Sequence, residues 1–202
     1  MNLDSAWLSQ NPNLNLLIRT RRASAKPSPY VLVELNSQGI AGILHQDWRF
    51  TIRLIRIPET ILKNIFKQAE NEYPSECCGV ILISPAKGET SLRVRPCRNA
   101  QNEYRRQDAK NFPRDSKTAY FIDPKDLLAL QKEIRQTDEV IKMVYHSHPD
   151  AEAYFSKEDQ RLALLDGEPV YPNVDYLVIS VKKGKAAGHQ IFSWDAVKKA
   201  FV

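Results

Sequence analysis

The stretch Cys78-Gly-Val-Ile-Leu-Ile83 constrains the fold most strongly, because it is apolar at every position. A strand with one face in water alternates apolar and polar residues, whereas an uninterrupted apolar strand is buried on both faces. A turn signal at Lys87-Gly88 and a second extended stretch at 91–96 predict that this strand continues into a hairpin. The sequence therefore predicts a sheet with 78–83 as one of its inner strands.

Helical and extended patterns alternate around this strand. Apolar residues recur at helical spacing from Ile61 to Ala69, which predicts a helix with Pro58 at its first position and Pro74 beyond its end. The remaining predicted elements are a strand at 119–122, a helix from Asp123 or its neighbour to Ile134, a strand at 140–145, a helix at 156–165, a hairpin at 175–181 and 188–194, and a short tail helix. No Gly-rich phosphate loop follows any of these strands. We therefore expect an α/β fold with a mixed central β-sheet flanked by helices.

The 202 residues suffice for one domain with a sizeable core and a short appendage. A content of 43% hydrophobic and 26% charged residues is typical of globular proteins. We divide the chain into an N-terminal extension or arm, 1–50, and a domain, 51–202. Residues 1–29 are rich in Asn, Ser, Arg and Pro, so we expect weak order there. Elements predicted in the front section are an apolar anchor at 14–18 and strands at 30–35 and 49–57.

Several features argue against other classes of protein. No apolar run approaches the roughly 18–20 residues that span a bilayer, and residues 1–15 lack the pattern of a secretory signal, so we expect a cytoplasmic protein. Three cysteines without a C-x-x-C pair argue against a disulfide framework and a thiolate zinc site, and we expect all three to be small buried residues. Residues 1–57 hold seven Lys and Arg against three Asp and Glu and therefore carry most of the net positive charge of the chain. The rest of the chain is nearly neutral and shows no basic patch of the kind that binds nucleic acid.

The stretch Tyr145-His-Ser-His-Pro149, at the end of a predicted strand, is the first indication of chemistry. Residues i and i+2 of a strand share a face, so His146 and His148 project in parallel and can reach one ion. Asp159 is available as a third ligand in the first turn of the next helix, where the helix dipole favours a carboxylate. Imidazoles and carboxylates bind zinc, and three protein ligands with an open position are typical of a catalytic site. The sequence therefore predicts a catalytic Zn²⁺ centre.

Hydrolysis at such a centre needs a base, and Glu76 is our candidate. It precedes the apolar strand at an element boundary, where an acid has little use in packing. Its carboxylate would take the proton of an attacking water and deliver it to the leaving amine. Ser156 is our candidate for a hydrogen bond to the oxyanion that forms on the scissile carbonyl.

Each of these signals also has a plainer interpretation. An isolated His-x-His pair most often belongs to an ordinary strand, and Ser156-x-x-Asp159 is also the pattern of a helix capping box. Capping and metal binding by this pair are compatible. Asp150 and Glu152 are rival carboxylates in the loop, and we rank them below Asp159.

Jointly, four ordered positions at fixed local spacing resemble the signature of a known family: Glu76, His146-x-His148 and Ser156-x-x-Asp159. This is the signature of the JAMM metalloproteases, the active branch of the MPN (JAB1/MPN/Mov34) domain. Two further stretches resemble the small prokaryotic JAB-type members: Phe121-Ile-Asp-Pro-Lys-Asp-Leu-Leu and Tyr171-Pro-Asn-Val-Asp-Tyr-Leu-Val-Ile-Ser. The resemblance covers about 55–200. It implies a JAMM/MPN metalloprotease domain at 51–202 with the MPN/JAB layout, which is similar to that of cytidine deaminases.

The resemblance also implies roles and a reaction. In this family the two His and the Asp bind zinc, the Glu is the base and the Ser supports the oxyanion. The reaction is hydrolysis of the amide or isopeptide bond after the C-terminal Gly-Gly of a ubiquitin-like or sulfur-carrier protein, which would be the substrate of a deubiquitinase-like enzyme. An E1-like or E2-like pathway is the implied setting, and the tail would add as a strand beside the zinc, near the polar loop 98–117.

Two hypotheses from other classes compete with the enzyme. The first is a non-catalytic MPN-type module that binds such a tail or a partner subunit without cutting it. The complete ligand set and the base favour the enzyme over this module. The second is a metallophosphoesterase, which would need more ligands for a second ion than the four histidines of this chain provide.

Overall fold

The computed structural model describes residues 57–202. The predicted arm, its anchor and the strands at 30–35 and 49–57 lie outside the described residues, except for Ile57. The division of the chain at residue 50 therefore stays a prediction. Among the helices of the described range, none combines the length and the apolar character that crossing a membrane requires.

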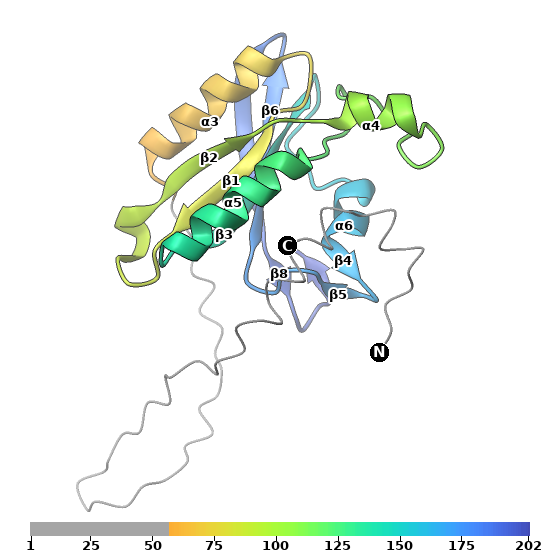
Figure 1. Cartoon of the computed structure of the whole chain (residues 1–202). Helices are drawn as coiled ribbons and strands as arrows, with labels where there is room; N and C mark the ends of the chain where they lie inside the picture. Colours follow the sequence, from red (N-terminus) through yellow and green to blue (C-terminus); the bar gives the residue numbers. More distant parts are fainter. Residues whose placement is uncertain (1–56) are drawn as a thin grey trace, which may run out of the picture.

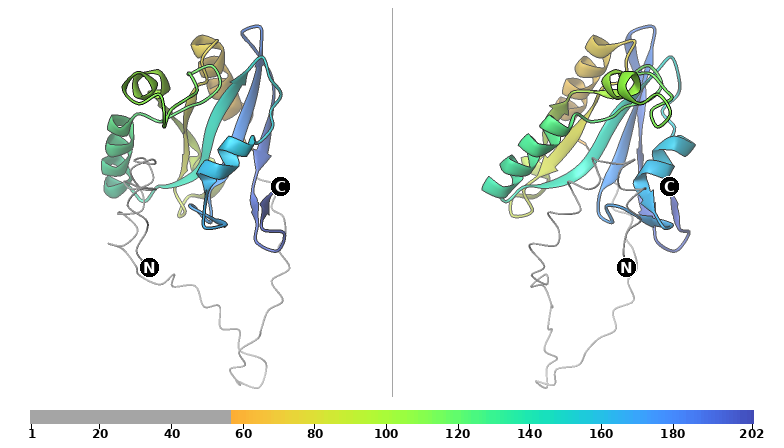
Figure 2. Two further views of the ribbon diagram at one scale, coloured as in Figure 1. Left: turned by 90° about the vertical axis from the view of Figure 1, so that its right-hand side faces the viewer. Right: turned by 45° about the vertical axis from the view of Figure 1, so that its right-hand side comes forward.

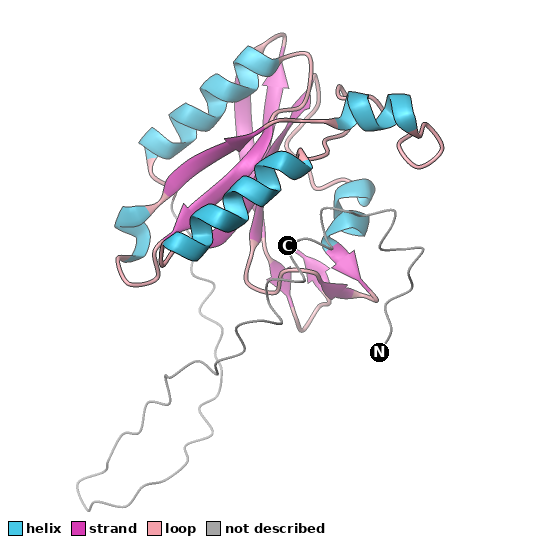
Figure 3. Ribbon diagram, in the orientation of Figure 1, coloured by secondary structure: helices cyan, strands magenta, loops and turns pink. Residues whose placement is uncertain are grey.

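A five-stranded sheet in the order β2-β1-β3-β6-β7 forms the centre of the fold (Figure 1). β3 and β6 run parallel, and all other neighbours in the sheet are antiparallel (Figure 3). The strands are β1 (Cys78–Ile83), β2 (Arg93–Cys97), β3 (Val140–Pro149), β6 (Asp175–Lys182) and β7 (Lys185–Phe192). The sheet is therefore mixed, and β1 lies inside it between β2 and β3, as the apolar run predicts.

Helices α3 and α5 cover opposite faces of this sheet (Figure 2). Ile81 of β1 packs in one cluster with Ile65 of α3, whereas Val80 and Leu82 pack in another with Leu130 of α5. Neighbouring residues of a strand point to opposite faces, so the two clusters lie on the two sides of β1. The helices are α3 (Glu59–Glu72), α4 (Gln101–Gln107), α5 (Pro124–Gln136), α6 (Lys157–Ala163) and the 3-10 helix η1 (Gly88–Ser91). The predicted α/β fold, a mixed sheet flanked by helices, is confirmed.

Proline and a capping acid mark the helix starts. Pro58 is the N-cap of α3 rather than its first helical residue, so the helix begins one residue later than predicted. The helix ends before Pro74. α5 begins at Pro124, and the Asp123 side chain caps it by accepting a 2.9 Å hydrogen bond from the backbone N–H of Lys125. These signals are local, which is why the sequence predicts them within one residue.

Gly79 lies where β1 passes a buried tyrosine. A Cβ added there would overlap the Tyr145 hydroxyl group and lie 2.7 Å from the Arg95 carbonyl oxygen. Tyr145 is fully buried and donates a 2.5 Å hydrogen bond to the Gln68 side chain, so it has little room to move. We expect Gly79→Ala to lower the free energy of unfolding by about 1–3 kcal/mol in urea denaturation. Gly188→Ala in β7, with no atom within 4 Å of the added carbon, should change it by less than about 0.5 kcal/mol. Equal losses in the two variants would contradict this account of the packing.

The predicted tail helix is wrong. The chain instead ends in an antiparallel pair, β8 (Trp194–Asp195) and β9 (Ala200–Phe201). Asp195 Oδ1 accepts hydrogen bonds of 2.9 and 3.0 Å from the backbone N–H groups of Val197 and Lys198, which closes a turn. Phe201 then packs edge-on against Phe155, at 4.9 Å between ring centroids.

A second small pair of strands, β4 (Leu164–Leu165) and β5 (Glu168–Pro169), follows α6.

The predicted strand at 119–122 is also wrong. Ile122 makes an isolated bridge to Asn99 instead of joining the sheet. The Asn99 side chain accepts a 3.1 Å hydrogen bond from the Phe121 N–H and donates one of 3.1 Å to the Ala119 carbonyl oxygen. Backbone hydrogen bonds from the Ala100 N–H to the Phe121 carbonyl oxygen, 2.7 Å, and from the Asp123 N–H to the Arg98 carbonyl oxygen, 2.9 Å, also hold this segment beside 98–100.

The segment 98–117, predicted as a loop, contains helix α4. One apolar anchor holds this helix: Tyr104 packs on Phe112 and Phe121, at 5.2 and 4.4 Å between ring centroids. A single anchor gives no helical periodicity, so the pattern of apolar residues does not reveal the helix.

Candidate metal centre

The carboxyl end of β3 carries the two histidines inside the sheet. His146 lies opposite Cys78 of β1 and Val178 of β6, and His148 lies opposite Ser180 of β6. Both side chains are buried and share one face, as the two-residue period of a strand requires. Their Nε2 atoms lie 3.1 Å apart. The structure thus brings the first two predicted ligands together.

Asp159 reaches the same point from the first turn of α6. Its Oδ1 lies 3.4 Å from His146 Nε2, and its Oδ2 lies 3.6 Å from His148 Nε2. Ligand atoms of the three residues all lie within 4.8 Å of one another. Asp159 also belongs to a capping box, because its Oδ2 accepts a 2.8 Å hydrogen bond from the Ser156 N–H while Ser156 Oγ accepts one of 3.1 Å from the Asp159 N–H. The cap fixes the carboxylate against the two rings.

A backbone contact orients His148. Its Nδ1 lies 3.2 Å from the Glu152 carbonyl oxygen, and since that oxygen can only accept, Nδ1 carries the proton. In a neutral ring, the form that binds metal, this leaves the lone pair of Nε2 directed at His146 and Asp159. Such contacts behind a ligand fix the ring and its tautomer in metal sites. His146 is held differently, by the ring of Tyr120 stacked on it at 4.5 Å between centroids.

The donor set fits a divalent cation. Burial, more than any other cause, lowers the pKa of His146, so its ring is neutral at pH 7, as a metal ligand must be. Two imidazole nitrogens and a carboxylate then face one another. At most one proton can lie between the two Nε2 atoms. A cation among them would satisfy all three acceptors at once. Two His nitrogens and one carboxylate oxygen suit zinc and leave a position open.

The rival carboxylates are engaged elsewhere. Asp150 accepts hydrogen bonds of 2.8 Å from the Tyr73 hydroxyl and the Lys183 N–H. Glu152 directs its carboxylate to Lys182 and offers only its carbonyl to His148. Neither carboxylate belongs to the His-His-Asp group.

Glu76 is buried at the start of β1 and lines the same cavity as His148 and Asp159. Its backbone is fixed, because its N–H donates a 2.7 Å hydrogen bond to the Ser116 carbonyl oxygen. Burial and, second, the Asp159 carboxylate raise the pKa of the Glu76 side chain to about 9, against a weaker opposite effect of Arg114. Without a metal ion in the site, Glu76 therefore holds a proton at pH 7. A cation held by Asp159 would oppose part of this shift.

This shift makes stability depend on pH. In metal-free protein, the folded pKa of Glu76 lies above its usual value of 4.5, so stability is lost as the pH rises from about 5 towards 9. Gln does not titrate, so we expect Glu76→Gln to become more stable than the wild type over this window, by on the order of a few kcal/mol at pH 9. Urea denaturation with a chelator at pH 5, 7 and 9 measures the difference.

The exposed Glu89→Gln is the control for the loss of one carboxylate, and its difference from the wild type should stay constant. A constant difference for Glu76→Gln as well would show that Glu76 does not titrate across this window.

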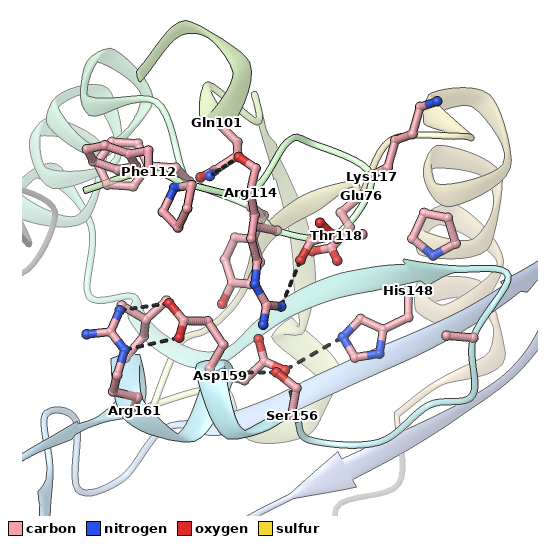
Figure 4. A pocket seen from close by; sticks show the side chains of 18 of the residues that line it. Glu76, Gln101, Phe112, Arg114, Lys117, Thr118, His148, Ser156, Asp159 and Arg161 are labelled. Atoms are coloured by element: carbon pink, nitrogen blue, oxygen red, sulfur yellow. Dashed lines mark hydrogen bonds and ion pairs between the residues drawn. The ribbon is translucent and has the colours of Figure 1, made fainter. Parts of the chain in front are cut away.

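A cavity of about 460 Å³ opens onto the group (Figure 4). Four of the five predicted site residues line it: Glu76, His148, Ser156 and Asp159. Part of its wall comes from the polar segment 98–117, which the sequence analysis places near the site. Tyr120 and Arg114 also line this cavity, and sequence reasoning missed both. Neither residue lies at a sequence distance from the histidines that is typical of a shared site, so their place in the cavity is seen only in the folded structure.

Comparison with known proteins identifies the family of the chain. Residues 58–196 match the family model of prokaryotic homologs of the JAB domain, and the chain belongs to this family. Among curated proteins, the chain is similar to the CysO-cysteine peptidases of Mycobacterium tuberculosis and Mycobacterium bovis. The identity is 27% over 132 residues, which cover 65% of this chain and 77% of each mycobacterial protein.

Two solution structures resemble the chain. Protein DSY2949 from Desulfitobacterium hafniense aligns with a TM-score of 0.48 and 23% identity, over 69% of this chain and 83% of that one. A protein from Salinibacter ruber aligns with a TM-score of 0.43 and 18% identity, over 72% of this chain and 84% of that one. The family rests on the sequence match rather than on these two alignments.

Proposed function

We propose that this chain is a zinc-dependent JAMM peptidase that hydrolyses the amide or isopeptide bond after the C-terminal Gly-Gly of a sulfur-carrier or other ubiquitin-like protein. The observation that carries the proposal is the convergence of His146, His148 and Asp159 beside the buried acid Glu76. Membership of the JAB family and relatives named as peptidases support it. The sulfur-carrier substrate follows the name of those relatives, and 51–202 would be the catalytic domain.

His146, His148 and Asp159 would hold the metal. When bound there, zinc would supply a Lewis acid that polarises the scissile carbonyl and makes water a better nucleophile at neutral pH. The cap at Ser156 and the Glu152 carbonyl keep two of the ligands in place before any metal arrives. This preorganisation supports a site built for one ion.

Glu76 would carry the proton. It lies in the cavity wall, where burial raises its pKa, and a metal ion held by Asp159 would oppose part of this rise and leave a carboxylate that can accept a proton. It would accept a proton from the attacking water and pass it to the amine that leaves, which a group with a raised pKa does well near neutral pH.

Ser156 would donate a hydrogen bond to the oxyanion. Its Oγ accepts the Asp159 N–H in the cap, which uses one lone pair and leaves the hydroxyl proton for another acceptor. Capping and oxyanion stabilisation are therefore compatible in one side chain, and Ser156 lines the cavity where the carbonyl would lie.

Mass spectrometry of a cleavage reaction tests the proposal. Zinc-loaded protein incubated with a CysO–cysteine adduct should release cysteine and leave a carrier that ends in Gly-Gly, and protein treated with a chelator should leave the adduct intact. Gly-Gly fusions with a linear extension or a lysine isopeptide, tested in parallel, show which kind of bond the protein hydrolyses. Binding without cleavage of all three would support the non-catalytic module instead. An E1-like or E2-like pathway partner stays a prediction.

A further inference from the structure

One cation that reaches into the cavity, Arg114, forms no ion pair with a carboxylate among the described residues. Arg114 lines the cavity, and Figure 4 shows its guanidinium group reaching into the space between Glu76 and Asp159. Its Nη1 donates a long hydrogen bond of 3.4 Å to the Thr118 carbonyl oxygen, which leaves most of its N–H groups for another acceptor.

The other basic side chains of the cavity are differently placed. Arg161 is held by Glu158 through hydrogen bonds of 3.1 and 2.7 Å to the two carboxylate oxygens. Lys117 turns away from the centre of the cavity (Figure 4). Arg114 is therefore the cation that a ligand in this cavity would meet.

The backbone is held at Arg114 and at Ser116. The buried Gln101 side chain donates a 2.9 Å hydrogen bond to the Arg114 carbonyl oxygen. Two residues further on, the Ser116 N–H donates a 2.9 Å hydrogen bond to the Asn102 side chain, and its carbonyl oxygen accepts the N–H of Glu76. The segment that presents the guanidinium group is thus tied to the residue we propose as the base. The Arg114 side chain itself is exposed, so a ligand that enters the cavity can reach it from a backbone that is already in place.

The chemistry of the site points to a carboxylate as the ligand. The planar fork of a guanidinium group matches the two oxygens of a carboxylate. The cavity, at about 460 Å³, is of the size of small-ligand sites, roughly 300–1,000 Å³, and takes a short peptide segment rather than a folded partner.

We propose that Arg114 binds the free α-carboxylate of the leaving group, so that the substrate is a carrier tail capped by one terminal amino acid. This inference rests on the proposed function. A Gly-Gly tail is uncharged, and in a lysine isopeptide the α-carboxylate of the lysine is consumed in the next peptide bond. A terminal amino acid alone places a carboxylate two bonds from the leaving nitrogen. Hydrolysis breaks the C–N bond, adds the water oxygen to the carrier carbonyl and leaves the water proton on the released amine.

Two substrates that differ in one group test the inference: CysO–cysteine and the same adduct with its terminal carboxylate converted to a carboxamide. We expect the zinc-loaded wild type to prefer the acid over the amide by about 10- to 100-fold in kcat/KM, as expected for loss of a charged hydrogen bond. Arg114→Gln should bring this ratio close to one, and Arg114→Lys should restore part of it because it keeps the charge but not the fork. Arg105→Gln, an exposed position of α4 outside the cavity, should keep the wild-type ratio.

The outcomes separate this inference from the function. Cleavage of acid and amide at equal rates by the wild type, or an equal loss on both substrates in Arg114→Gln, would overturn the role of Arg114 and leave the peptidase standing. The second result would instead indicate an acidic side chain of the carrier as the partner. If the wild type cleaves neither adduct but cleaves the linear or lysine-isopeptide fusion, this inference fails and the proposed function stands. If it cleaves none of these substrates, both fail.

Discussion

Glu76→Gln is expected to lower turnover by about 10²- to 10⁴-fold, which is the contribution of a positioned general acid–base group. Gln keeps the size and the polar character of the buried side chain but can neither accept nor deliver a proton. Zinc content should stay at about one ion per chain, because Glu76 is outside the His-His-Asp group. Steady-state kinetics on the cleaved adduct and elemental analysis of the purified protein measure the two quantities.

Glu152→Gln is the matched control. Its carboxylate is 76% exposed and its contact with His148 runs through the backbone carbonyl, which the substitution keeps. Turnover of this variant should stay within a few-fold of the wild type. Normal turnover in Glu76→Gln would show that another group handles the proton.

His148→Ala is expected to abolish metal binding and with it turnover. Loss of one of three ligands leaves the ion with one imidazole and one carboxylate, too few for the open three-ligand site. The wild type should be stabilised by zinc, by about 2.7 kcal/mol at a free concentration one hundred times the Kd, and the variant should gain nothing. Thermal unfolding with and without zinc, together with metal content, gives the measurement.

His189→Ala controls for the loss of a histidine. This residue of β7 is exposed and contacts the Phe66 ring of α3 at 5.8 Å between centroids, away from the His-His-Asp group. The variant should keep the zinc-dependent stabilisation. Zinc binding by His148→Ala as tight as in the wild type would remove this residue from the ligand set.

The central sheet and its two large helices were predictable because their signals are local. The apolar run of β1 requires burial on both faces, and the capping residues of α5 mark its start within the sequence itself. The strand period also predicts that His146 and His148 share a face, which the structure shows.

The remaining features depend on contacts between distant residues. The path of 119–122 depends on hydrogen bonds to the side chain of Asn99 and to the backbone of 98–100. The β8–β9 pair of the tail places Phe201 against Phe155, a residue much earlier in the chain. Arg114 enters the cavity because Gln101, in another part of the same segment, holds its backbone. Residue patterns along the chain do not encode such pairings.

The shared cap at the start of α6 has a consequence for mutagenesis. Ser156 holds Asp159 through two reciprocal hydrogen bonds, so the first turn of the helix and the carboxylate ligand form one mechanical unit. A truncated side chain at 156 would loosen the ligand as well as remove a hydroxyl proton. The lower turnover of such a variant would then combine both effects. Threonine keeps both the acceptor and the proton, so Ser156→Thr should show neither loss and is the control for a truncated side chain.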